Sequence, residues 1–121
     1  MKLSEFDFRV WDKDEKCFLD PYTKSRAVVK DLPNEKLLNL EIELFTGLYD
    51  NNNNKIYEGD IISIYVSGDF INYTVVYNKD KASFVAIVDD YEEDFTFYSD
   101  IEVIGNIHEN EEILKNTELL K

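Results

Sequence analysis

The chain has 121 residues, which fits a single domain over residues 1–121, and with 44% hydrophobic and 14% aromatic residues it is too apolar to be disordered. The formal net charge is −13, from 26 acidic and 13 basic residues, which argues against direct binding to nucleic acid or to an anionic membrane, because both need Lys and Arg. With a single cysteine (Cys17), no signal-like start and no apolar run of about 18 residues, the chain is predicted to be cytoplasmic.

The first predicted element is a half-buried strand over residues 5–10, where apolar and polar side chains alternate. A polar turn at 12–16 and a returning strand at 17–19 complete an N-terminal hairpin. Strict alternation places the Trp11 side chain on the face of the strand opposite to that of Val10. A tryptophan at a strand end indicates the edge of a core or an interface more than a ligand site, and Cys17 is interpreted as a small apolar filler rather than a nucleophile.

Residues 22–34 allow two interpretations, a short strand at 27–29 or a mobile loop. The next segment, 38–45, is the clearest strand of the sequence. Its apolar side chains recur at every second position, whereas a helix would scatter them around its axis. The predicted apolar face consists of Leu38, Leu40, Ile42 and Leu44.

A turn is predicted at residues 50–54, where Asp50 is followed by four asparagines. A calcium loop needs spaced carboxylates, a central glycine and a late glutamate. The segment lacks that pattern, so it is interpreted as a solvated loop tip.

The second half predicts an antiparallel meander. Gly59 and Asp60 form a turn before a strand at 61–66, and further strands follow at 70–77 and 82–88. Turns at intervals of about ten residues are typical of small barrels and sandwiches. Short strands are predicted at 95–98 and 101–104. A short C-terminal helix begins at Asn110 and is expected to dock through Ile113, Leu114 and Leu120.

The sequence offers little catalytic chemistry, so we expect neither an enzyme nor a cofactor or metal site. His108 is the single histidine, and its neighbours place it in a surface strand or bend. Zinc and phosphate sites need ligand sets or glycine-rich loops that this sequence lacks. Tyr65, Tyr73 and Tyr77 suggest a stacking platform for bases, but few basic residues lie near them in sequence.

Acidity is concentrated toward the C-terminus, since residues 89–121 hold 11 acidic and two basic side chains. The densest part is an acidic loop. Like charges so close together are typical of a solvated loop, while a surface for a protein partner is the second interpretation. The candidate partner surface consists of Asp89, Asp90, Glu92, Glu93 and Asp94.

Three blocks resemble a known family: residues 8–12, residues 46–62 with the run Ile-Tyr-Glu-Gly-Asp-Ile, and residues 102–110 with the run Val-Ile-Gly-Asn-Ile. Their order and spacing are similar to those of the YopX family of small proteins from bacteriophages and prophages of Gram-positive bacteria. The chain departs from the pattern at residues 17–18 and 43–45, and at His108, where a tyrosine is usual. The matching residues include Trp11, Gly47, Tyr57, Gly59, Asp60, Gly105 and Asn106.

The resemblance implies an all-β, SH3-like antiparallel barrel with extra elements, and self-assembly of some members. It carries no established activity and no catalytic residues. The matching glycines have a structural interpretation as turns before or between strands.

Two functional hypotheses follow. The first is a non-enzymatic phage accessory protein that acts through protein–protein contacts and forms a homo-oligomer, since a meander leaves strand edges that pair with another copy. The second is an acidic inhibitor of a basic host protein, which presents carboxylates where that protein expects phosphates. One continuous acidic face would favour the second hypothesis, and scattered charge would favour plain solubility.

Overall fold

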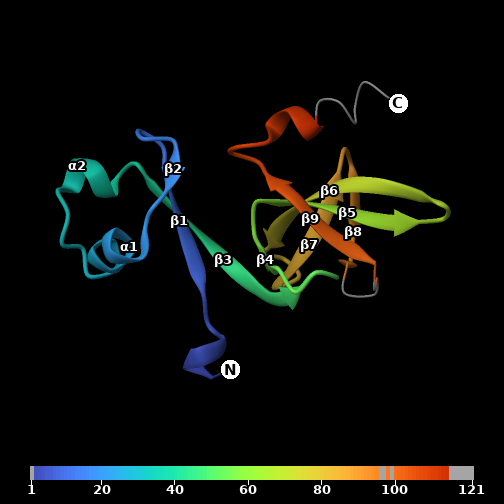
Figure 1. Cartoon of the computed structure of the whole chain (residues 1–121), viewed down its shortest axis with the longest axis horizontal. Coiled ribbons are helices and arrows are strands. Elements are labelled where there is room, and N and C mark those ends of the chain that lie inside the picture. The colour runs from blue at the N-terminus through green and yellow to red at the C-terminus, as the bar shows by residue number, and fades with distance from the viewer. Residues whose placement is uncertain (1, 96–97, 99, 115–121) are drawn as a thin grey trace. The chain divides into compact units, whose positions relative to one another are not determined.

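The computed structural model describes residues 2–95, 98 and 100–114. The chain divides into two compact units, an N-terminal unit (Met1–Phe45) and a C-terminal unit (Thr46–Lys121) (Figure 1). A single domain over the whole chain stays a prediction, and each unit is described by itself.

The N-terminal unit is built on an antiparallel ribbon. It contains η1 (Leu3–Glu5), β1 (Phe8–Asp12), β2 (Cys17–Phe18), α1 (Pro21–Val28), α2 (Asn34–Leu37) and the first six residues of β3 (Leu40–Tyr49). β1 pairs with β2, with Trp11 opposite Phe18, so the predicted N-terminal hairpin is confirmed. Its first strand begins at Phe8 rather than at residue 5, where η1 ends, and extends to Asp12. β1 also pairs with β3, with Val10 opposite Ile42.

Helix α1 corrects the strand interpretation of residues 27–29, and it replaces the predicted loop over residues 22–28, while residues 29–33 form an irregular connection to α2. The Asp20 carboxylate caps the helix by accepting the Thr23 amide at 2.7 Å, and Pro21 occupies the first helical position. Asp20 and Pro21, which follow the hairpin, therefore also begin a helix. This local signal outweighs the β-branched residues near the end of the segment.

The strand expected at 38–45 begins two residues later than predicted. Leu38 follows α2 as its C-terminal cap and is 80% exposed. The other three apolar residues pair with β1 as their alternation predicts. Leu40, Ile42 and Leu44 lie opposite Asp12, Val10 and Phe8.

A buried carboxylate ties the hairpin to α2. Asp12 is 1% exposed, accepts the backbone amides of Asp14 and Glu15, and forms an ion pair with Lys36 of α2. Burial alone would raise the pKa of Asp12, but the hydrogen bonds from Lys36, Glu15 and Asp14 lower it overall from its ordinary value of 3.8. The charged form of Asp12 is therefore part of the folded structure.

The lowered pKa of Asp12 makes the free energy of unfolding depend on pH in the acidic range. Because its folded pKa lies below the unfolded value, its contribution is present above that value and is lost as pH falls through the folded pKa. We expect Asp12→Asn to lower the free energy of unfolding at about pH 7 and to differ much less from wild type at about pH 3. Urea unfolding at both pH values measures this, and Asp14→Asn, an exposed carboxylate in the same turn, is the control. A difference that stays constant or grows in acid would contradict the assignment.

The C-terminal unit is a five-stranded antiparallel sheet that curls into a half-barrel (Figure 1). Its strand order is β8-β7-β6-β5-β9, and the predicted meander and fold class are confirmed. β4 pairs with β3 rather than with this sheet. The strands are β4 (Lys55–Tyr57), β5 (Asp60–Val66), β6 (Asp69–Asn78), β7 (Ser83–Val88), β8 (Tyr91–Glu93) and β9 (Ile101–Asn106).

The core of this unit lies on the concave side of the sheet and includes β4. The strand predicted at 95–98 is wrong for its described residues, since the fully buried Phe95 has 3-10 geometry and Tyr98 is outside regular structure. Residues 96 and 97 lie outside the described residues. Residues 111–114 are helical, as predicted, while Leu120 also lies outside the described part. The buried cluster consists of Ile56, Ile62, Ile64, Tyr73, Val75, Ala86, Phe95 and Ile101.

The turn at residues 50–54 covers the outer edge of β9. The buried Asp50 carboxylate accepts the amides of Asn52, Asn54 and Val103 at 2.8–2.9 Å. Asn51 exchanges hydrogen bonds with the backbone of Ile101. A row of edge groups that would otherwise invite another strand is thus satisfied within the chain. The predicted loop is confirmed, and it is a structural cover rather than a free tip.

Close packing between Gly105 and Asn110 explains why glycine occupies position 105. A Cβ on Gly105 would lie 2.6 Å from Asn110 Oδ1 and 2.8 Å from Asn110 Cβ. The same Oδ1 accepts the Asn106 amide at 3.2 Å, and the Asn106 carbonyl accepts the Asn110 amide at 3.0 Å. Glycine is required here because the asparagine must approach the strand.

Gly105→Ala is expected to cost about 1–3 kcal/mol of unfolding free energy, because the new methyl group overlaps the Asn110 side chain. Asn110→Gly removes the atoms in conflict at the cost of their hydrogen bond. In a double-mutant cycle by denaturant unfolding, the combined loss should be smaller than the sum of the single losses. Strict additivity would mean that the two residues are not in conflict.

Candidate interaction site

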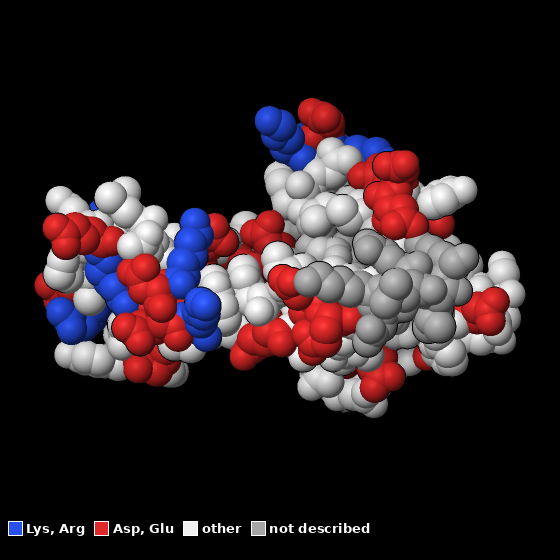
Figure 2. Space-filling model, turned by 90° about the horizontal axis from the view of Figure 1, so that it is seen from above, with Lys and Arg blue, Asp and Glu red and all other residues white. Residues whose placement is uncertain are grey.

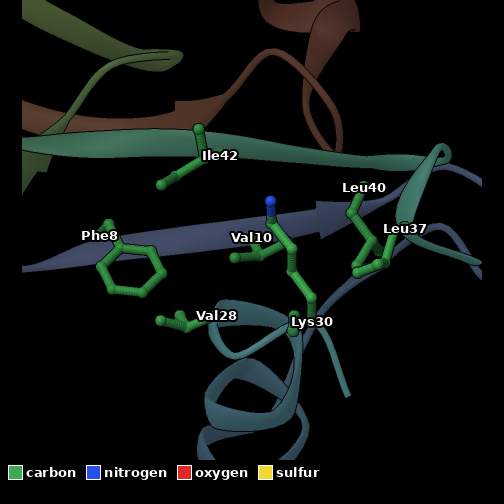
Figure 3. A pocket seen from close by; sticks show the side chains of 8 residues that line it. Phe8, Val10, Val28, Lys30, Leu37, Leu40 and Ile42 are labelled. Carbon is green, nitrogen blue, oxygen red and sulfur yellow. The ribbon is translucent and has the colours of Figure 1, made fainter. Parts of the chain in front are cut away.

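An open apolar groove lies between the helices and the ribbon of the N-terminal unit, with a volume of about 290 Å³ (Figure 3). Alternate residues of β1 and β3 form one wall, because their side chains share one face of the ribbon. The α1 end and α2 form the other wall. The lining residues are Phe8, Val10, Ala27, Val28, Lys30, Leu37, Leu40 and Ile42.

Lys30 is the one charged residue of this lining. It follows α1 with a left-handed backbone (φ 58°), and its side chain extends toward β1 and β3 (Figure 3). Among the ion pairs and side-chain hydrogen bonds of the described residues, none involves its amine. Lys24, in contrast, contacts the Phe8 ring at 4.6 Å and donates to the Phe8 carbonyl. The groove therefore combines apolar walls with one cation that is open to an anionic group.

The groove stays open because the N-terminal unit buries little. Among the described residues, Val10 and Trp11 are the two buried hydrophobics of this unit, against ten in the C-terminal unit. The exposed fractions of Val28 and Ile42 are both 58% although they line the groove. A unit of 45 residues is near the lower limit for burying a sufficient core alone.

The predicted acidic loop is partly a strand. Asp89 and Asp90 form a turn, while Glu92 and Glu93 belong to β8, which pairs with β7. Asp94 follows β8 and is exposed. The sequence predicted a loop here because repulsion between neighbouring carboxylates favours an extended, solvated segment. The pairing of β8 with β7 depends on the folded sheet and has no signal in the local sequence.

The two glutamates of β8 point to opposite faces of the sheet. Glu92 lies opposite Ile87 and accepts hydrogen bonds from Lys81 at 2.5 Å and Asn78 at 2.6 Å, which lower its pKa. Glu93 lies opposite the buried Ala86 and accepts the Tyr98 hydroxyl at 3.3 Å. The proposed partner surface is therefore divided, and Glu92 already has a cationic partner.

Burial, with a contribution from nearby Glu93, raises the pKa values of Tyr73 and Tyr98. The shift strengthens the neutral form that a phenol already has at pH 7, and the Tyr98 hydroxyl is the donor to Glu93. Glu93 is integrated into the inner side of the sheet.

The three tyrosines suggested as a stacking platform are not brought together. Tyr65 lies opposite Phe70, on the face of β5 and β6 away from the core. Tyr73 is buried in the core and Tyr77 shares its face of β6. A platform for bases is thus absent among these three residues.

Across residues 2–95, 98 and 100–114, no three His, Cys, Asp or Glu side chains gather to form a metal site. In the same ranges, no helix has both the length and the apolar character needed to cross a bilayer. His108 lies in the turn after β9, where its amide donates to Asn106.

Charge differs sharply between the units. The N-terminal unit has ten acidic and eight basic residues, and the C-terminal unit has 16 acidic and five basic residues. On the face that Figure 2 shows, both signs are interspersed in the N-terminal unit. On the same face, the acidic side chains drawn in the C-terminal unit form several separate groups rather than one continuous patch.

The residues of the three matching blocks have structural roles. Trp11 is buried and contacts the Phe18 ring at a centroid distance of 4.9 Å. Gly59 has φ 88°, a conformation that favours glycine, and its amide donates to the Val75 carbonyl. Asp60 accepts the Tyr57 amide at 2.8 Å, which fixes the same turn. The predicted turn role is wrong for Gly47 and Gly105, which lie within β3 and β9. Beside Gly47 (φ 87°), the Thr46 hydroxyl donates to the Ile56 carbonyl.

Comparison with known proteins agrees with this fold. A family model described as YopX protein matches residues 7–115. The crystal structure of protein EF1440 from Enterococcus faecalis has a TM-score of 0.60 and 22% sequence identity, covering 90% of this chain and 97% of that chain, and it supports the fold alone. None of the curated proteins compared with the chain matches it. Because the family model spans most of the sequence, the chain belongs to the YopX family.

Proposed function

We propose that this chain is a non-enzymatic, cytoplasmic accessory protein of a phage or prophage that acts through protein–protein contacts and assembles with copies of itself. The observation that carries the proposal is the apolar groove of the N-terminal unit, with its exposed Val28 and Ile42. Exposed apolar side chains gathered in one groove are a feature of protein interaction sites.

The location of strand edges also favours the groove as the contact surface. The outer edge of β9 is covered by Asp50 and Asn51, and β8, at the other edge of the sheet, has only three residues. Strand addition to the C-terminal sheet, the route expected from the meander alone, is therefore restricted.

Analytical ultracentrifugation of the full chain over nanomolar to high micromolar concentrations tests self-association. We expect the average mass to rise with concentration and the association to persist in high salt, because apolar contacts are not screened. A monomer throughout this range would overturn the proposal.

The second candidate is an acidic inhibitor of a basic host protein, and the acidic excess of the C-terminal unit favours it. The divided β8 carboxylates and the Glu92–Lys81 pair make this candidate weaker than self-association. Such a contact should weaken steeply with salt. A purified basic DNA-binding protein whose DNA affinity is unchanged by a molar excess of the chain would count against it, whereas salt-sensitive competition would support it.

A further inference from the structure

Residues 2–6, which Asp7 joins to β1, form a short arm whose apolar side chains are uncovered. Leu3 is 88% exposed and Phe6 is 49% exposed. η1 lies beyond the start of β1 and projects away from α1 and α2 (Figure 1). The described contacts of the arm are internal, except that the Phe6 ring packs beside Phe8 at 5.7 Å.

The arm is pre-shaped as an apolar knob with an acidic flank. Leu3 opens the 3-10 turn and Phe6 follows it as an extended C-terminal cap whose amide donates to the Leu3 carbonyl, so the two exposed apolar residues flank one turn. The Glu5 carboxylate accepts the Lys2 amide at 3.2 Å and keeps further acceptor capacity toward solvent. A partner for this arm must offer an apolar hollow beside a cation.

The groove of the N-terminal unit has that chemistry, with aliphatic walls and the Lys30 amine. We infer that the arm of one copy inserts Leu3 into the groove of a second copy and places Glu5 against Lys30. This inference rests on the proposed self-association and names the surfaces that carry it. Two copies that exchange arms around a two-fold axis form a closed dimer, because the same two surfaces are used twice.

Charge complementarity supports this occupant. Copies of a chain of net charge −13 repel one another, and pairing the groove cation Lys30 with the arm carboxylate Glu5 offsets part of this repulsion at the apolar contact. Phe6, beside Phe8, also extends the apolar wall of the groove toward an incoming arm.

Substituting the knob tests the apolar half of the contact. Leu3→Ser should weaken self-association at least tenfold by sedimentation velocity, because burying a leucine contributes about as much free energy as a tenfold change in affinity. Leu38→Ser is the matched control, since Leu38 is 80% exposed, outside the groove lining, and should leave association unchanged. Equal effects of both substitutions would overturn the arm–groove contact.

Charge exchange tests the pairing directly. Glu5→Lys and Lys30→Glu each place like charges at every contact between identical copies, and each alone should weaken association several-fold to about tenfold. A mixture of the two variants restores opposite charges at both contacts of a mixed dimer. Native mass spectrometry should therefore show mixed dimers well above the statistical proportion.

The outcomes separate this inference from the proposal on which it rests. Self-association of wild type with no preference for mixed dimers would overturn the arm exchange and leave self-assembly standing. A monomeric wild type would overturn both. Unchanged far-UV circular dichroism of the variants is expected, because the substituted side chains are exposed.

Discussion

Asp50→Ala is expected to lower the free energy of unfolding by about 3 kcal/mol, because it removes a buried carboxylate that holds the turn at residues 50–54. The carboxylate is 6% exposed and receives three backbone amides and the Asn54 side chain. Burial alone would raise the pKa of Asp50, but hydrogen bonds from the amides of Val103, Asn54 and Asn52 outweigh this effect, so the pKa of Asp50 is lowered. Removing the charge leaves these donors unpaired and releases the turn from β9.

Denaturant unfolding of Asp50→Ala beside Asn52→Ala measures this loss. Asn52 is exposed in the same turn, so its substitution should change stability by less than about 0.5 kcal/mol. Hydrogen exchange adds a local signal, because the Val103 amide should lose protection in the first variant only. Equal stabilities of the two variants would show that Asp50 does not hold the β9 edge.

Ile42→Asp is expected to weaken self-association by about thirtyfold or more, as truncation of a central interface residue does. Ile42 lies in the wall of the groove and is 58% exposed, so an unpaired carboxylate there would be buried on association. Sedimentation velocity of the full chain provides the measurement.

The matched control is Phe70→Asp, which introduces the same charge at an exposed apolar position of the C-terminal unit. Val28→Asp, in the helical wall of the groove, provides a second variant in case Ile42→Asp unfolds. If Phe70→Asp disrupts association and both groove variants do not, the contact surface lies in the C-terminal unit.

The meander was predictable because its signals are local. Alternating side chains and turn residues such as Gly59 and Asp60 fix both the existence and the ends of β5, β6 and β7 to within about two residues. The N-terminal hairpin follows from the same logic, and so does the side of β1 on which Trp11 lies.

Helix α1 could also have been found from a local signal, the Asp20–Pro21 pair at its start. The valines near its end favoured a strand instead, and capping outweighs this weak preference. β8 had no such signal, because Glu92 is stabilised by Lys81 and Asn78, residues that only the folded sheet places beside it.

The groove was beyond prediction because four separate segments form it, and its one cation, Lys30, has no neighbour in sequence that suggests a site. The acidic residues, in contrast, were conspicuous in the sequence and are divided in the structure. Composition located the charge but not the faces on which it lies.

Amine labelling of the wild-type chain at low and high protein concentration tests most directly whether the groove is the surface between copies. Lys30 should react freely in dilute protein and become protected as the chain associates, while the exposed Lys79 of the C-terminal unit should react equally in both. Association that leaves Lys30 as reactive as Lys79 would contradict the assignment of the groove.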